Sequence, residues 1–395
     1  MKQPLLFDWG VSTLYGWGVI GLNLLRYWPA AAGTPVYCGG QIHIDSLGGM
    51  DPLSLRALAP ALLENGRLRG RWPELMAESG GKFEGAVLHA LGNRFSGGKR
   101  PSEGGLSGVA TAAIMVFEDT TLPDALEIAH EYDVVITGSS WCESVLREKG
   151  VTNIATVIQG IDPALFHPAP RSGALGDRFA VFSGGKLEFR KAQDLVLLAF
   201  RAFAERHPEA VLVTAWHSPW PEVAVTLNHN PAIEPVTKNE DGKIDAAAWA
   251  RVNGLREDQF IDVGAIPNHL MARVLREMDA ALFPNRCEGG TNLVAMECLA
   301  CGIPTIVSDN TGQKDLVATG APYPLTRQRS VEFDSVGTEG WGESDIDEIV
   351  EALERVWRDR QAAHRRGAFG AAVMDDWAWP CFTERLRDTL APFCG

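Results

Sequence analysis

The chain has 395 residues, with 36 lysines and arginines against 50 aspartates and glutamates, which gives a formal net charge of −14. Its 46% hydrophobic and 22% charged content is typical of a globular protein and excludes wholesale disorder. The acidic total disfavours a protein that holds nucleic acid by neutralising phosphates, because such proteins carry clustered Lys and Arg. At about 150 residues per domain, the length predicts two or three domains.

Short apolar runs alternate with amphipathic segments through the first part of the chain. This rhythm predicts a parallel sheet whose strands are buried by helices on both faces. Residues 167–173 are rich in Pro, Gly and Ser and are typical of a linker between domains. Before this linker we expect strands at 5–7, 36–38, 86–89, 111–117, 134–137 and 154–158, and helices at 19–28, 53–63 and 140–149.

The same rhythm resumes behind the linker, so the predicted fold class is α/β with two Rossmann-like domains. Their expected bounds are 1–168 and 174–375, followed by a C-terminal helical segment at 376–395. The polar, proline-containing stretch 216–252 is expected to be a loop-rich insertion. The expected strands are 179–183, 210–214, 259–262, 280–283 and 305–308, and the expected helices are 192–205, 269–277, 293–300, 347–357 and 382–390.

The cysteines and the apolar segments indicate the cellular setting. Seven scattered cysteines are odd in number and predict no complete disulfide framework, so we interpret them as small buried groups. No stretch approaches the roughly 18 uncharged apolar residues of a membrane-spanning helix. Asp8 interrupts the N-terminus before a signal-peptide apolar run develops. We therefore expect a cytoplasmic protein without a transmembrane segment, for which peripheral contact with a membrane stays open.

The most informative segment begins directly after the expected strand 280–283. A turn of small residues, Gly289-Gly290-Thr291-Asn292, leads into a helix at Leu293. Free backbone N–H groups at a helix start bind anions, and glycine lets a phosphate approach the backbone closely. Glu288 before the turn and Glu297 within the helix are suited to accept hydrogen bonds from sugar hydroxyls. The segment therefore predicts a site for a sugar nucleotide.

A second segment follows the expected strand 179–183. After two glycines, of which Gly185 is the second, come the cations Lys186, Arg190 and Lys191 beside a helix start. Cations at this place stabilise a diphosphate leaving group as a glycosyl–phosphate bond breaks. A basic helix start is also common on plain protein surface. The two segments together favour a site, because ligands of open α/β sheets bind at the carboxyl ends of the strands.

These two segments, in this order, resemble the retaining glycosyltransferases of family 4 (group 1), which have the GT-B fold. Gly185-Lys186 and Lys191-Ala192 match that family's "G-R-x(3–4)-K-G" clamp. Glu288-Gly289 and residues 297–304 match its "E-G-x-G…E-A-M-A-x-G-x-P" donor motif. Residues 159–168 and 308–312 resemble two further family runs. The chain departs from the pattern at Lys186 (Arg in the family), at Ala192 (Gly), and by one extra residue between Glu288 and Glu297.

The resemblance implies two Rossmann-like domains that face a central cleft. The first domain would lie on the acceptor side, the second would bind the nucleotide sugar, and the terminal helix would cross back to the first. By this resemblance, Glu288 orients the sugar, Glu297 holds the ribose, and Lys186 and Lys191 stabilise the departing phosphate. The implied diphosphate contacts are completed by Gly185, Arg190, Gly289, Gly290, Thr291, Asn292 and Leu293.

In the first domain, the resemblance falls on His89 and on the glycine-rich loop 8–18. From the residues alone, His89 fits a buried core histidine. The resemblance implies instead that its ring faces the cleft at a strand end and hydrogen-bonds the transferring sugar. Gly16 and Gly18 are implied to approach the donor diphosphate. The aromatic rings interleaved with these glycines (Trp9, Tyr15 and Trp17) are suited to stack on sugars.

We expect no metal and no other cofactor. Asp345 and Asp347 form a D-x-D pattern, but they open an expected helix, where acids interact favourably with the helix dipole. We therefore interpret them as capping residues. The nucleotide sugar is a substrate in this interpretation.

The function that follows is retaining transfer of a hexose-type sugar from a nucleotide-diphosphate sugar to an unidentified hydroxyl acceptor. The enzyme would be a hexosyltransferase, with a UDP-sugar favoured as donor. The acceptor class stays open among glycans, proteins, lipids and small molecules, and nucleic acid is disfavoured. The alternatives are a sugar-nucleotide epimerase or hydrolase of the same fold, and a non-catalytic protein that binds nucleotide sugars.

Overall fold

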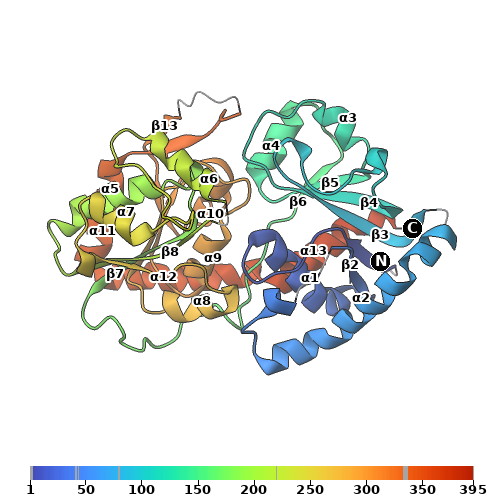
Figure 1. Ribbon diagram of the computed structural model, residues 1–395, viewed down its shortest axis with the longest axis horizontal. Coiled ribbons are helices and arrows are strands. Elements are labelled where there is room, and N and C mark those ends of the chain that lie inside the picture. The colour runs from blue at the N-terminus through green and yellow to red at the C-terminus, as the bar shows by residue number, and fades with distance from the viewer. Residues whose placement is uncertain are drawn as a thin grey trace. The chain divides into compact units, whose positions relative to one another are not determined.

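The computed structural model describes residues 3–40, 42, 44–78, 81–218, 220–331 and 337–394. The chain forms two compact units. Unit 1 comprises the residues through Gly160, the short stretch Pro267–His269 and the segment from Trp377 onward. Unit 2 comprises Ile161–Ile266 and Leu270–Asp376. Both are α/β units built on a six-stranded sheet (Figure 1).

The sheet of unit 1 is parallel, in the order β2-β1-β3-β4-β5-β6. Its first strand, Leu5–Phe7, has no exposed side chain, as expected for a strand covered on both faces. The chain direction across the sheet reverses between β1 and β3, so this is the topological switch point of unit 1. The strands are β1 (Leu5–Phe7), β2 (Val36–Cys38), β3 (Lys82–Leu91), β4 (Ser107–Met115), β5 (Val134–Thr137) and β6 (Ile154–Thr156).

The C-terminal helix of the chain, α13, belongs to unit 1 and packs against α1. Trp379 at its start is 1% exposed, and Arg387 donates a hydrogen bond to the Ala31 carbonyl over 2.7 Å. A Cβ at Gly160 would lie 2.5 Å from the Trp379 backbone nitrogen, so glycine permits this close approach. The helices are α1 (Gly16–Ala32), α2 (Pro52–Glu78), α3 (Ala125–Ala129), α4 (Ser140–Glu148) and α13 (Trp379–Leu390).

The sheet of unit 2 is also parallel, in the order β12-β11-β10-β7-β8-β9. Its switch point lies between β7 and β10, which are adjacent and pair Val181 with Ala280. The strands are β7 (Phe179–Lys186), β8 (Ala210–His217), β9 (Phe260–Asp262), β10 (Ala280–Phe283), β11 (Thr305–Ser308) and β12 (Tyr323–Leu325). The helices are α5 (Gln193–Ala204), α6 (Pro221–Ala224), α7 (Ala246–Val252), α8 (Asn268–Leu275, which begins in the short stretch of unit 1), α9 (Leu293–Ala300), α10 (Lys314–Val317), α11 (Ile346–Arg358) and α12 (Arg360–Met374).

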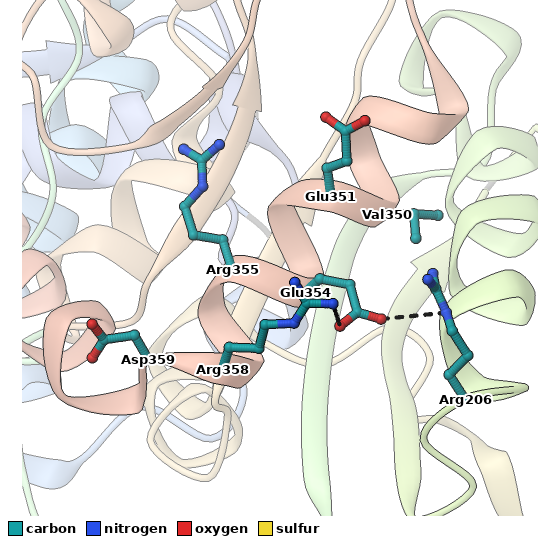
Figure 2. Close-up of a pocket in the computed structure, with 7 residues that line it drawn as sticks. All are labelled: Arg206, Val350, Glu351, Glu354, Arg355, Arg358 and Asp359. Atoms are coloured by element: carbon teal, nitrogen blue, oxygen red, sulfur yellow. Dashed lines mark ion pairs between the residues drawn. The ribbon is translucent and has the colours of Figure 1, made fainter.

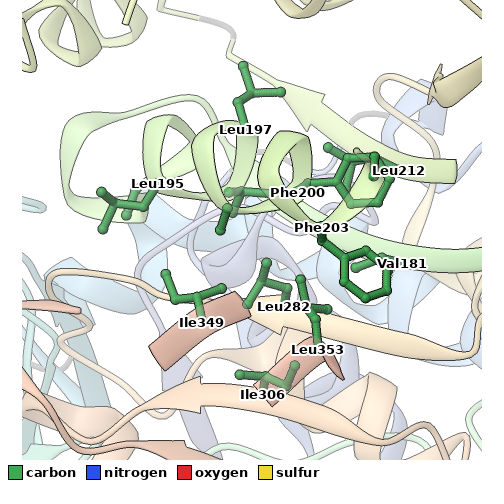
Figure 3. Packing of buried hydrophobic residues seen from close by; sticks show 14 of the residues in the cluster. Val181, Leu195, Leu197, Phe200, Phe203, Leu212, Leu282, Ile306, Ile349 and Leu353 are labelled. Atoms are coloured by element: carbon green, nitrogen blue, oxygen red, sulfur yellow. The ribbon is translucent and has the colours of Figure 1, made fainter. Parts of the chain in front are cut away.

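The main core of unit 2 lies where α5 and α11 pack on the sheet (Figure 3). Phe200 and Phe203 of α5 are fully buried there against strand residues such as Leu212 and Leu282. Every residue of α5 from Gln193 to Phe200 is buried, as are Phe203 and Ala204, so the helix is covered on more than one face. This packing fixes α5 and therefore the loop that leads from β7 into it.

A short antiparallel pair, β13 (Gln328–Ser330) and β14 (Gly342–Ser344), completes unit 2. It is anchored to the β11 end through the hydroxyls of Ser308 and Ser344, which lie 2.6 Å apart. Short 3-10 segments occupy Ile44–Leu47, Asn93–Phe95, Pro101–Glu103, Phe189–Lys191, Val225–His229, Glu257–Gln259, Thr311–Gln313, Asp375–Trp377 and Ala391–Phe393.

The predicted α/β class is confirmed, and the differences in the elements have physical causes. Strand β7 extends to Lys186, so the two glycines of the clamp segment belong to the strand end. Helix α12 is not among the expected helices, and it contains two buried glycines, Gly367 and Gly370. In the structure Gly367 packs on the backbone of Gly302, where a Cβ would lie 2.0 Å from its carbonyl oxygen. The stretch 216–252, expected to be loop-rich, holds α6, a 3-10 segment and α7.

The expected linker is held against unit 2. Arg171 forms an ion pair of 3.0 Å with Asp279, and the backbone N–H groups of Ser172 and Gly173 donate to the Glu277 carboxylate. These contacts involve unit 2 residues alone. The Pro/Gly composition therefore marks an irregular segment that is tied down by carboxylates.

Candidate donor site

The two motif segments of unit 2 flank its switch point. One follows β7 and the other follows β10, and these strands are neighbours in the sheet. The two segments are in contact at Gly184. A Cβ at this position would lie 3.1 Å from the Val294 Cγ1 of α9. Gly185 has φ +133°, a backbone conformation that glycine tolerates. The sequence thus places both motifs at the edge where open α/β sheets bind ligands.

The cations of the clamp segment lie together with two carboxylates. Lys186 Nζ and Arg190 Nε are each 3.1 Å from Glu188 Oε2. Arg190 Nη1 donates to Glu288 Oε2 over 3.1 Å, and Lys191 donates to the other oxygen of Glu288. We call these five residues the clamp cluster. It holds three positive and two negative charges at the carboxyl edge of the sheet.

Glu288 forms the buried base of the clamp cluster. Its side chain is 6% exposed and also accepts a hydrogen bond from Asn285. Its backbone is fixed by Thr311 and Gly312, because the Glu288 N–H donates to Thr311 Oγ1 over 2.9 Å and its carbonyl accepts from the Gly312 N–H over 2.9 Å. Glu288 therefore orders Lys191 and Arg190 as well as the turn that follows it.

Burial and charge act in opposite directions on this pair. Burial acts to raise the pKa of the Glu288 carboxyl, but Lys191 and Arg190 lower it below its ordinary value. Burial lowers the pKa of the Lys191 ammonium, and the Glu288 carboxylate acts against that shift. Each charge thus favours the charged form of the other, which is the arrangement required of buried ions.

The small-residue turn leads into α9 as expected. Asn292 is its N-cap, with φ +66° and a side chain that accepts from the Ala295 N–H over 3.3 Å. Gly289 and Thr291 are buried, whereas Gly290 and Leu293 are half-buried. A Cβ on Gly312 would lie 2.1 Å from the Gly290 carbonyl, so a second glycine supports the turn. Glu297 lies one turn into α9 and is 2% exposed.

Sequence reasoning missed Arg286, which joins the two segments. Its guanidinium is fully buried, forms two hydrogen bonds with Asp194 of 2.9 and 2.6 Å, and donates to the Phe189 carbonyl over 2.7 Å. A further hydrogen bond of 2.8 Å reaches Glu343 on β14. The forked geometry of arginine suits such a bidentate contact. No sequence pattern indicated it, because its partners are distant along the chain.

The insertion is tied to the same network. Asn230 donates to Asp194 over 2.6 Å, and the Phe189 N–H donates to Thr226 Oγ1 over 3.0 Å. Trp220, which is 54% exposed, has its ring 5.2 Å from Lys186 Nζ. The insertion therefore supports the clamp segment and brings an exposed aromatic ring to one of its cations.

The structure explains the family's glycine at the position of Ala192. This residue begins α5 with φ +57° and ψ +38°, the left-handed region. A Cβ is disfavoured there by roughly 1 kcal/mol, and glycine is not. Ala192 thus adopts the left-handed conformation that the clamp segment requires, at the cost of backbone strain.

In unit 1, His89 lies on β3 two residues before the strand ends at Leu91, and its implied contact with a sugar stays a prediction. Its ring is 1% exposed, with Nδ1 3.0 Å from Asp8 Oδ2 and Nε2 2.8 Å from the Leu106 carbonyl oxygen. Asp8 follows β1 and also accepts from the Ala90 N–H over 3.0 Å. This pair flanks the switch point of unit 1, and sequence reasoning missed Asp8.

The neighbours of His89 influence its charge. Because a carbonyl only accepts, Nε2 must carry a proton, and Nδ1 meets a carboxylate best when it is protonated too. Burial acts to lower the pKa of His89, but Asp8 and the Leu106 carbonyl raise it above its ordinary value. Asp8 and the Leu106 carbonyl therefore favour the protonated form of the ring.

The glycine-rich loop of unit 1 differs in part from the expectation. Trp9 is buried against Phe7 and Trp17, so its face is not available for stacking on a sugar, whereas Tyr15 is 50% exposed. Gly18 is buried, and its Cβ would lie 2.5 Å from that of Ser12, which gives this glycine a packing role. Gly16 is exposed at the start of α1.

A separate groove lies on unit 2 between the end of α5 and α11 (Figure 2). Its volume is about 470 Å³, and its buried carboxylate, Glu354, pairs with Arg206 and Arg358 at 3.3 Å each. Arg206 precedes β8, so the groove lies at the opposite edge of the sheet from the clamp cluster. It is lined by Arg206, Val350, Glu351, Glu354, Arg355, Arg358 and Asp359, and its formal charges balance.

Within the described part of the chain, no group of three His, Cys, Asp or Glu side chains is placed to hold a metal ion. The interpretation of Asp345 as a cap is confirmed, because its carboxylate accepts from the Glu348 N–H over 3.0 Å. Among the same residues, no helix combines the length and apolarity needed to cross a bilayer.

Solved structures with the same fold cover almost the whole chain. Sucrose-phosphate synthase from Thermosynechococcus elongatus superposes with a TM-score of 0.65 over 99% of both chains, at 16% identity. Anabaena HepE in complex with UDP and glucose gives 0.64 over 99% of this chain and 100% of the other, at 12% identity. The fold is GT-B.

Part of the chain is similar in sequence to glycosyltransferases of family 4. Residues 267–386 match the family described as "Family 4 Glycosyltransferase in conflict systems". This match confirms the resemblance to family 4 over that segment.

Two curated mannosyltransferases share part of their sequence with the GT-B chain. A GDP-mannose-dependent alpha-(1-6)-phosphatidylinositol dimannoside mannosyltransferase of Mycobacterium tuberculosis is 26% identical over 197 residues, 48% of this chain and 44% of that protein. The corresponding monomannoside enzyme of Mycolicibacterium smegmatis is 24% identical over 246 residues, 59% and 54% of the two chains. The matched part of this chain thus spans about half the length of these relatives.

Proposed function

We propose that the protein is a retaining glycosyltransferase that moves a hexose-type sugar from a nucleoside-diphosphate sugar to a hydroxyl acceptor. The observation that carries the proposal is the clamp cluster, which gathers Lys186, Arg190 and Lys191 beside the start of α9 at a switch point. Cations and backbone N–H groups at one edge are the groups that stabilise a departing diphosphate. The family 4 likeness supports the same reaction.

In the proposed reaction, the bond between the sugar C1 and the diphosphate oxygen breaks, and its electron pair leaves with the diphosphate. Lys186, Arg190 and Lys191 stabilise that charge. The acceptor oxygen bonds to C1 on the same face, and its proton passes to the leaving phosphate. Glu288 holds Lys191 and Arg190 in place, and we retain for it the role of orienting the sugar. Glu297 is proposed to hold the ribose.

For unit 1 we propose that His89 acts through Asp8. The His89 ring is buried, whereas the Asp8 side chain keeps 12% of its surface exposed. A carboxylate held by His89 and the Ala90 N–H retains capacity to accept a hydroxyl hydrogen bond. Asp8 would then orient a substrate hydroxyl, and His89 would position Asp8.

The donor nucleotide has two candidates. We favour a UDP-sugar from the frequency of such donors in family 4, and a solved structure with the same fold holds UDP and glucose. The sequence relatives are named for GDP-mannose. A UDP-sugar and GDP-mannose therefore form the first pair of donors to test. We propose that no metal or other cofactor is required.

The test is release of nucleoside diphosphate from UDP-glucose and GDP-mannose in the presence of a panel of sugar, lipid and small-molecule acceptors. We expect turnover with one donor and a product whose anomeric configuration, measured by NMR, matches that of the donor. Lys191→Met should lower turnover about 100-fold, because one charge stabilising the leaving group is lost. The exposed Lys314→Met on α10 is the matched control.

Each other result has a defined meaning. Equal turnover by Lys191→Met and the unaltered protein would refute the role of the clamp cluster. Conversion of the donor without an acceptor would identify an epimerase or hydrolase. Tight nucleotide binding without any turnover would identify a non-catalytic binding protein.

A further inference from the structure

The two carboxylates of the clamp cluster are held differently. Glu288 is 6% exposed and has an Asn285 hydrogen bond and a fixed backbone in addition to its cations. Glu188 keeps 20% of its side chain exposed, and the ion pairs of its carboxylate are with Lys186 and Arg190. Glu288 is thus built into the fold, whereas the Glu188 side chain is more exposed, although the Oε2 that faces the two cations is buried.

Glu188 shares one oxygen between two cations. Lys186 Nζ and Arg190 Nε are each 3.1 Å from Glu188 Oε2. Lys186 is 30% exposed and is also held over the Trp220 ring. All three clamp cations therefore already have an anionic partner, since Lys191 is paired with Glu288, and the cluster has a net charge of only +1.

A diphosphate competes directly with that carboxylate. Its charged oxygens are attracted to the same Lys186 and Arg190 cations that form ion pairs with Glu188. The diphosphate must either displace the Glu188 carboxylate or bind while that negative charge remains close by. Either case reduces the binding free energy that the cations contribute. Removal of Glu188 would raise the net charge of the cluster to +2.

We propose that Glu188 is a positioning residue that limits the affinity of the donor site for nucleoside diphosphates by pairing with Lys186 and Arg190. The inference rests on the proposed function of the same site. Its consequence for the reaction is faster departure of the nucleoside diphosphate product, because the carboxylate returns to the cations as the product leaves.

The test is isothermal titration of the full chain with UDP and with GDP, without added metal. Glu188→Gln should bind the preferred nucleotide about fivefold to tenfold more tightly than the unaltered protein, since a negative charge close to the phosphate is removed. Glu188→Asp keeps the charge but moves it away by one carbon, so its affinity should lie between the two. Glu222→Gln, an exposed residue of α6, makes the same charge change outside the cluster and should leave the affinity unchanged.

A gain of affinity distinguishes this role from a structural one, because a damaged loop would weaken binding. Glu188→Ala serves as a second neutral variant and should change affinity in the same direction. If the unaltered protein binds a nucleotide and the neutral variants bind it equally or more weakly, the inference about Glu188 is overturned. The proposed function is not affected by that result. Absence of binding by both the unaltered protein and Glu188→Gln contradicts the proposed function itself.

Discussion

The two sheets carry charged groups at equivalent topological positions and use them in opposite ways. At the switch point of unit 1, Asp8 and His89 form one pair, and the histidine is buried. At the switch point of unit 2, the clamp cluster is larger, and Lys186 and Glu188 keep part of their surface exposed. The difference shows that charged groups at equivalent strand ends can differ in burial and pairing. A position at a strand end alone therefore does not determine how accessible such a group is.

The largest expected effect tests whether Arg286 is the structural centre of the unit 2 site. Arg286→Met leaves Asp194 as an unpaired buried charge, so the free energy of unfolding should fall by about 3–5 kcal/mol in urea denaturation. Arg358→Met removes an arginine that is 74% exposed and should change it by less than about 1 kcal/mol. If the two substitutions lower the free energy of unfolding equally, the buried Arg286 network is no more important for stability than an exposed ion pair.

The next effect tests the charge of Glu288. Glu288→Gln leaves Lys191 without its buried partner and should lower the free energy of unfolding at pH 7 by about 2–3 kcal/mol. Because the folded pKa of Glu288 is lowered, its contribution is present above the unfolded pKa of about 4.3 and is lost as the pH falls through the folded value. Urea denaturation between pH 3 and 7 should therefore show a weaker acid dependence for Glu288→Gln. The exposed Glu351→Gln should keep the acid dependence of the unaltered protein.

A smaller effect tests the pair in unit 1. Asp8→Asn should lower the pKa of His89, measured by NMR titration of the ring protons, and reduce stability at pH 6 by about 1–2 kcal/mol. The folded pKa of His89 is raised, so the contribution is complete below the unfolded pKa of about 6.5 and is lost as the pH rises through the folded value.

The difference in stability between Asp8→Asn and the unaltered protein should therefore shrink toward pH 9. Asp119→Asn breaks a pair with Arg94 and serves as the control, with no such trend. A His89 pKa that does not move would show that protonation of the ring does not depend on Asp8.

The smallest effect tests backbone strain at the clamp. Ala192→Gly should raise the free energy of unfolding by about 0.5–1 kcal/mol, because glycine adopts positive φ without steric cost. The same change at Ala199, within α5, should destabilise by about 1 kcal/mol. Thermal unfolding of both variants separates a position in left-handed backbone from one in an ordinary helix.

The sequence predicted the features that depend on local pattern. Strand β10 and helix α9 have the expected bounds, because an apolar run and an N-cap signal are local properties. It also predicted the α/β class and the two segments that meet beside β7 and β10. It did not predict Arg286, Asp8 or the β13–β14 pair, since each depends on partners that only the folded chain brings together. The contacts of the His89 ring with Asp8 and the Leu106 carbonyl likewise could not be predicted, because a strand position does not report which loops cover it.

The most direct test of the central claim is a crystal structure of the protein with UDP or GDP bound. The account predicts that the diphosphate lies at the carboxyl edge of the unit 2 sheet, in contact with clamp cations and with the backbone N–H groups at the start of α9. A diphosphate bound elsewhere, such as in the groove lined by Arg206 and Arg358, would contradict the account.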